Sequence, residues 1–174
     1  MNEAYEVYRW LAHRLRGERN ILRETLKNEK AVQYLLIWPI FEQKCFEGFM
    51  QKGKIPDFAR KYQAIYAELN CDGYANYFHS RYQDKKLLRN LLYSGKFEDK
   101  FTEFENAISD SYSNLTDQQK LMILLYVSYR YRNNIFHGNK GIESWARYET
   151  QIEKCLHFMM SLIDCMELHG DKAA

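Results

Sequence analysis

The sequence predicts an all-α protein, a single domain over residues 1–174 folded as an up-and-down bundle of about six helices. Only two prolines and eight glycines interrupt the 174 residues, and so few chain breakers favour long helices over many short strands. Apolar residues also recur every three or four positions along several segments, a spacing that gives a helix one apolar face. With 46 % hydrophobic residues, the chain can fill one core of ordinary size.

The first half of the chain predicts three helices. The apolar face of the first is formed by Val7, Leu11, Leu15, Leu22 and Leu26. A second helix is expected over residues 31–51, with Pro39 either kinking it or marking its effective start. Asp57 can cap a third, short helix that reaches about Leu69.

The second half predicts the remaining helices, over residues 74–93, 97–108, 117–137 and 143–168. Thr116 and Gln119 have the spacing of a capping box, in which each side chain bonds the other residue's backbone N–H. Gly138 suits the left-handed position just after a helix end. Residues 121–127 are apolar nearly all round, so this helix should be buried on both sides. We expect its own core on one side and a second protomer on the other.

The net charge of +2 is too small to indicate a nucleic-acid partner by itself. Basic residues do gather locally, because residues 9–30 carry seven Lys or Arg against three Glu. Residues 81–96 and 130–140 are also basic. These stretches are interpreted first as solvated helix faces.

Four cysteines without a C-x-x-C pair are typical of buried, reduced thiols in an intracellular protein. The first residues show no secretory signal pattern, and the run 121–127 is too short to span a bilayer. We therefore expect a soluble, cytoplasmic protein without a membrane partner. The histidines His13, His79, His157 and His169 show no ligand spacing, so neither a metal site nor a cofactor is expected.

One segment, Arg132-Asn133-Asn134-Ile135-Phe136-His137-Gly138, carries the functional prediction. It resembles the Arg-polar-x-x-x-His signature of the HEPN superfamily (higher eukaryotes and prokaryotes nucleotide-binding domains). It is similar to the form found in HEPN domains of bacterial toxin and defence systems. The resemblance implies an all-α bundle, with the motif near the end of a late helix, and a dimeric endoribonuclease that needs no metal. An antitoxin partner is a further candidate.

The chemistry of RNA cleavage is compatible with these residues. Attack of a ribose 2′-hydroxyl on the adjacent phosphate requires a base and an acid, and histidine can be either near neutral pH. Because each chain supplies one motif histidine, a homodimer that joins two His137 side chains would supply both. Arg132 would stabilise the phosphate, and Asn133 would donate a hydrogen bond or hold His137 in one tautomer. The products would be a 2′,3′-cyclic phosphate and a 5′-hydroxyl.

Three nearby residues are candidates for RNA binding: Arg130, Asn134 and Lys140. Arg130 shares a helix face with Asn133 and His137, whereas Arg132 lies about 140° round from His137 on a helix with 100° between residues. Either the helix loosens before His137, or the long Arg132 side chain wraps round to the site. Arg132 is preferred for the motif, and Arg130 is kept as a phosphate contact.

Other interpretations of the same residues stay open. His137 and Gly138 also suit an ordinary helix C-terminus, where histidine interacts favourably with the helix dipole. The chain could then be a non-catalytic helical module that binds RNA, a nucleotide or another protein. A purely structural bundle is the third alternative.

Overall fold

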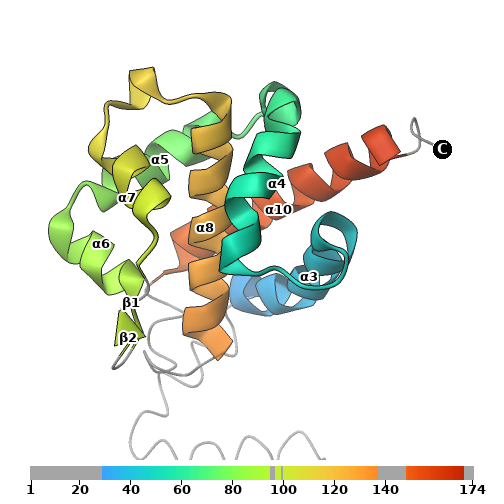
Figure 1. Ribbon diagram of the computed structural model, residues 1–174. Helices are drawn as coiled ribbons and strands as arrows, with labels where there is room; N and C mark the ends of the chain where they lie inside the picture. The colour runs from blue at the N-terminus through green and yellow to red at the C-terminus, as the bar shows by residue number, and fades with distance from the viewer. Residues whose placement is uncertain (1–28, 95–96, 99, 137–147, 171–174) are drawn as a thin grey trace, which may run out of the picture.

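The computed structural model describes residues 29–94, 97–98, 100–136 and 148–170 (Figure 1). The predicted all-α class is confirmed. The α-helices in these ranges are α3 (Glu29–Phe46), α4 (Ile55–Tyr62), α5 (Asp72–Tyr82), α6 (Lys85–Leu92), α7 (Thr102–Ser109), α8 (Asp117–Phe136) and α10 (Glu149–Gly170). Short elements join them: the 3-10 helices η1 (Lys52–Lys54), η2 (Gln63–Leu69) and η3 (Tyr112–Asn114), and the strands β1 (Tyr93–Ser94) and β2 (Phe97–Glu98). The first predicted helix lies outside the described residues.

Helix α8 stands in the middle of the bundle (Figure 1). It packs against α4 and η2, against α5, α6 and α7, and against α10. Its residues 121–127 are all buried, and the ring of Tyr126 packs 4.6 Å from that of Phe101 and 4.5 Å from that of Phe104. The prediction of burial all round is confirmed. The inference that a second protomer must cover one side is wrong, because elements of the same chain cover this run.

Helices α3 and α10 pack side by side although they come from opposite ends of the described chain. Lys30 pairs with Glu153 at 2.8 Å, and Lys44 pairs with Glu167 at 2.7 Å. From the first ion pair to the second, the residue number rises on both helices, so the two helices run parallel. Within the described ranges, α3 and α10 are therefore neighbours that do not alternate up and down.

Helix α3 ends earlier than residue 51, the predicted end. Glu47 and Gly48 adopt left-handed conformations, with φ of 55° and 103°. The Gly48 N–H donates to the Glu42 carbonyl at 3.0 Å, and this bond turns the chain back on the last turn of the helix. Pro39 lies inside α3 and does not start it.

Two further boundaries differ from the prediction. The helix expected over residues 74–93 is divided at Asp84, whose carboxylate accepts from the N–H groups of Lys86 and Leu87 and caps α6. The helix expected from Phe97 begins only at Thr102, because β1 and β2 pair as a two-residue antiparallel ladder. Both differences arise from capping and pairing that a four-residue spacing does not reveal.

The capping box at the start of α8 is confirmed. The Thr116 N–H donates to Gln119 Oε1 at 2.9 Å, and the Gln119 N–H donates to Thr116 Oγ1 at 3.3 Å. The third predicted helix is present as α4 followed by η2, which ends at left-handed Asn70.

All four cysteines are buried and unbridged, as predicted. Burial raises the pKa of the Cys45 and Cys155 thiols to about 12. In the described ranges, no helix combines the length and apolar character that crossing a bilayer requires.

Candidate active site at the end of helix α8

The last two turns of α8 present three faces to three different neighbours. Arg132 faces α3, Arg130 faces the end of α6, and Tyr131 faces α5 and the residue before α10. The helix stays regular through Phe136. His137, Gly138 and Lys140 lie outside the described residues.

Arg132 is held from two sides. Its Nη1 donates to Asn133 Oδ1 at 3.0 Å, and its guanidinium carbon lies 5.8 Å above the ring centre of Trp38 on α3. Such cation–π contacts stabilise by about 0.5–2 kcal/mol. The residue as a whole is half-buried.

Asn133 is buried, with an exposed fraction of 9 %, and its carboxamide oxygen accepts from Arg132. Its second polar group, the NH₂, can only donate. Helix α8 is continuous through Phe136, so it does not loosen between Arg132 and Phe136. The Arg132 side chain bends towards Asn133. His137 lies outside the described residues, so the reach of the Arg132 side chain towards it stays a prediction.

Arg130 does not have the expected position for a phosphate contact. Its guanidinium is buried, with an exposed fraction of 3 %. Nε donates to the carbonyl of Leu91 at 3.0 Å and Nη2 to that of Leu92 at 3.1 Å. The last carbonyls of a helix lack partners within the helix, and Arg130 supplies donors to them at the end of α6. We therefore assign Arg130 to the structure and not to RNA binding.

The site formed by the described residues is thus a clamp: Arg132 and Asn133 on α8 against Trp38 on α3. No family model, curated protein or solved structure matches this chain. The resemblance to HEPN domains stays a prediction carried by the motif. Trp38 was missed by the sequence analysis, because nothing in the sequence places residue 38 beside residue 132.

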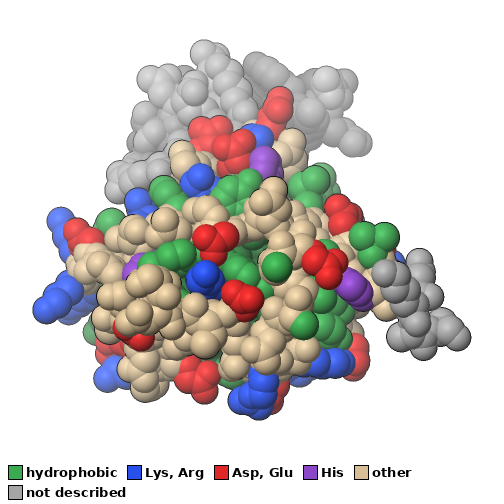
Figure 2. Space-filling view, turned by 90° about the horizontal axis from the view of Figure 1, so that it is seen from above, with side chains coloured by type: hydrophobic (Ala, Val, Ile, Leu, Met, Phe, Trp, Pro, Cys, Tyr) green, Lys and Arg blue, Asp and Glu red, His purple; other side chains and the backbone are tan. Residues whose placement is uncertain are grey.

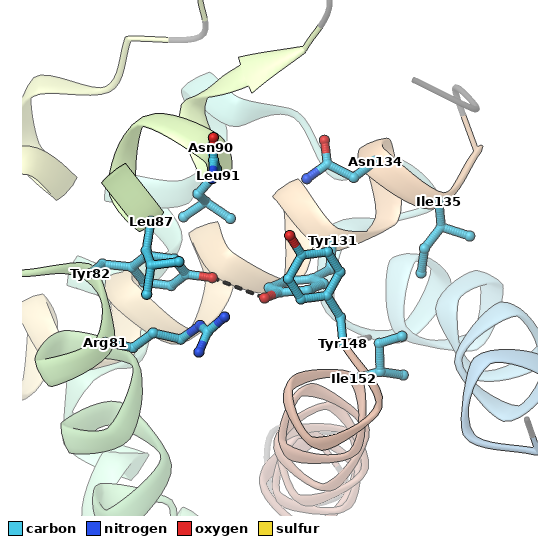
Figure 3. Close-up of a pocket in the computed structure, with 10 residues that line it drawn as sticks. All are labelled: Arg81, Tyr82, Leu87, Asn90, Leu91, Tyr131, Asn134, Ile135, Tyr148 and Ile152. Atoms are coloured by element: carbon cyan, nitrogen blue, oxygen red, sulfur yellow. Dashed lines mark hydrogen bonds between the residues drawn. The ribbon is translucent and has the colours of Figure 1, made fainter. Parts of the chain in front are cut away.

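Asn134 faces a separate pocket between α5, α6, α8 and the start of α10 (Figure 3). The space in this pocket that water can occupy is about 20 Å³, which is enough for a single water molecule. It is open to solvent on one side, with Asn134 and Asn90 at its rim in Figure 3. The full lining is Arg81, Tyr82, Leu87, Asn90, Leu91, Tyr131, Asn134, Ile135, Tyr148 and Ile152.

The pocket lining combines apolar and polar side chains. The hydroxyls of Tyr82 and Tyr131 share a hydrogen bond of 3.0 Å, and burial raises the pKa of both, so they are neutral. Within the described ranges, neither Arg81 Nε nor Asn134 Oδ1 has a hydrogen-bond partner, although both atoms are buried. The pocket lining therefore includes one buried donor and one buried acceptor without a partner in these ranges. The sequence analysis anticipated Asn134 but not Arg81.

Proposed function

We propose that this protein is a metal-independent endoribonuclease of the HEPN type, acting as a toxin or defence effector in the cytoplasm. Arg132, Asn133 and His137 form its site, and Lys140 contributes to RNA binding. The observation that carries the proposal is the hydrogen bond between Arg132 and Asn133, the two motif residues that the structure describes. A guanidinium fixed before the substrate arrives stabilises a phosphorane-like transition state without reorganisation.

Trp38 supports a functional role for Arg132. Its indole N–H is buried without a hydrogen-bond partner among the described residues, which costs about 1–3 kcal/mol. Phenylalanine would fill much of the same space without that cost. Tryptophan offers the strongest aromatic face for a cation, so its presence fits the need to hold Arg132.

Asn133 acts mainly by orienting other groups. Its oxygen accepts from Arg132 and keeps a second lone pair, which can accept the ring N–H of His137. That bond keeps the ring proton on one nitrogen and leaves the lone pair of the other nitrogen free. A neutral His137 in one tautomer is suited to act as the general base for the 2′-hydroxyl.

The homodimer remains part of the proposal because the reaction needs two acid–base groups. An exposed apolar stripe on α3 is our candidate for the interface. Val32, Leu36 and Ile40 follow at intervals of four and have exposed fractions of 45 %, 67 % and 47 %. The stripe lies on the side of α3 opposite Trp38. A second copy docked there would stand about one helix diameter, 10–12 Å, from the Arg132 clamp.

We expect the purified full chain to cleave RNA in the presence of EDTA and to leave 2′,3′-cyclic phosphate and 5′-hydroxyl ends. The His137→Ala variant should lose about 10²-fold in rate, the usual contribution of a general acid or base. End-group analysis and a gel-based cleavage assay measure both. His157→Ala is the matched control, because His157 is an exposed histidine on α10. Equal cleavage by His137→Ala and the wild type would remove the assignment.

The interface is tested by Leu36→Glu. A charge on the exposed stripe leaves the core untouched, so we expect a folded monomer that has lost both dimerisation and RNA cleavage. Light scattering after size exclusion gives the oligomeric state. Leu168→Glu is the matched control, since Leu168 on α10 is 65 % exposed. A dimeric Leu36→Glu variant would exclude this surface, and a monomeric, active wild type would exclude the shared site.

A second candidate function is a nucleotide-binding module without catalysis. The pocket favours it, because Arg81 Nε and Asn134 Oδ1 offer one donor and one acceptor beside the ring of Tyr148. Bases stack on aromatic rings and bond through their edges. The pocket admits only the edge of a base, so the rest would lie outside. Nucleotide binding without cleavage, unchanged by Arg132→Ala, would favour this alternative.

A further inference from the structure

We propose that Glu68, Cys165 and His169 form a binding site for a divalent metal ion of the zinc class. One carboxylate oxygen, the thiol sulfur and one imidazole nitrogen lie within 4.8 Å of one another. The Nε2 of His169 is 3.0 Å from Glu68 Oε2. This cluster goes beyond the proposed RNA cleavage and overturns the expectation that no histidine stands at ligand spacing from a cysteine.

The fold explains why these three side chains meet. Cys165 and His169 are four residues apart on α10, so they occupy the same face one turn apart. Glu68 belongs to η2, which packs against α10. The sequence contained one half of the signal, the C-x-x-x-H spacing on a helix. The other half comes from a segment about 100 residues earlier in the chain.

The ligand chemistry selects the metal. Thiolate, imidazole and carboxylate are the three ligand types that zinc binds, at about 2.0–2.3 Å. In a tetrahedron of that size, neighbouring ligand atoms stand about 3.4 Å apart. The distance of 3.0 Å between His169 Nε2 and Glu68 Oε2 is already close to this ligand–ligand separation. Glu68 is exposed and His169 half-buried near the end of α10, so both side chains can move towards the sulfur.

The local charge also favours a cation. Burial, Glu68 and Asp164 all raise the pKa of the Cys165 thiol. A divalent ion would reverse this by binding the thiolate and releasing its proton. Figure 2 shows a histidine side chain close to acidic side chains on the right. Three protein ligands leave a fourth position for water.

The metal site and the Arg132 clamp are separate. Glu68 lies on η2, and Cys165 and His169 lie on α10, whereas the clamp is formed by α8 and α3. A metal ion here would join η2 to α10 and bind none of the clamp residues. Binding of the metal and cleavage of RNA can therefore fail or succeed independently.

The full chain, stripped with a chelator, is titrated with Co²⁺ and with Zn²⁺. We expect one ion per chain, a thiolate-to-cobalt charge-transfer absorption band, and a higher melting temperature with Zn²⁺. Cys165→Ser should abolish the band. Glu68→Gln and His169→Ala should each weaken binding at least about 10-fold. RNA cleavage should be the same with and without the metal.

Matched controls carry the same substitutions at residues outside the cluster: Cys45→Ser, His157→Ala and Glu167→Gln. These three should bind Co²⁺ like the wild type. A band that persists in Cys165→Ser, or equal binding by cluster and control variants, would overturn the site. Absence of a 1:1 complex in the wild type would do the same, and would show that His169 and Glu68 form only an ion pair.

Discussion

Replacing Arg130 by methionine is expected to lower the free energy of unfolding by about 2–5 kcal/mol. The substitution keeps much of the aliphatic stem but removes the donors that bond the carbonyls of Leu91 and Leu92. Each buried acceptor that loses its partner costs about 1–3 kcal/mol. A loss of this size is a large part of the stability of an ordinary domain.

Urea unfolding followed by circular dichroism measures the change. The control is Arg60→Met, because Arg60 is 62 % exposed and pairs with Asp57 at the surface. Exposed pairs contribute less than about 1 kcal/mol, so this variant should unfold almost like the wild type. If Arg130→Met were equally stable but defective in RNA binding, Arg130 would be a phosphate contact after all.

Replacing Arg132 by alanine is expected to lower the rate of RNA cleavage about 10²–10³-fold, with a much smaller effect on stability. Removal of one fixed donor to a developing negative charge has this effect in other enzymes. The fall should appear in kcat, because the guanidinium acts on the transition state. Arg132→Lys should rescue little, since an ammonium group cannot reproduce the planar donor geometry.

Trp38 tests whether the clamp positions Arg132. Trp38→Phe should reduce kcat about 2–30-fold, the equivalent of a cation–π contact of 0.5–2 kcal/mol. Phe41→Leu is the control, because Phe41 is also buried in the core and packs against Trp38. Equal loss of activity in both variants would mean that Trp38 only fills the core. Unchanged cleavage by Arg132→Ala would remove Arg132 from the site altogether.

Local sequence signals predicted the parts of the fold that depend on neighbours in the chain. The capping box of Thr116 and Gln119 involves residues three apart, and it is present as predicted. Asp84 is an equally local cap, but apolar residues continue on both sides of it and hid the break between α5 and α6. The β1–β2 ladder depends on pairing between strands, which helical spacing does not encode.

The candidate site shows the same limit more clearly. Arg130 and Arg132 are two residues apart and have the same charge, and the motif favoured Arg132 without showing where either side chain lies. The choice depends on what surrounds α8. The end of α6 buries Arg130, and α3 supplies Trp38 to Arg132. Both neighbours are tens of residues away in sequence, and only the folded chain places them.

The parallel pairing of α3 with α10 has a consequence for synthesis of the protein. Helix α3 leaves the ribosome first, and its main helical partner begins at Glu149. At about 5–20 residues per second, α3 waits roughly 5–20 s for that partner. During this interval, helix α3, which carries the Trp38 side chain that contacts Arg132, lacks the support of α10. If the chain is a nuclease, its site is completed only after α10 has been synthesised, which would delay damage to the RNA of the cell that makes it.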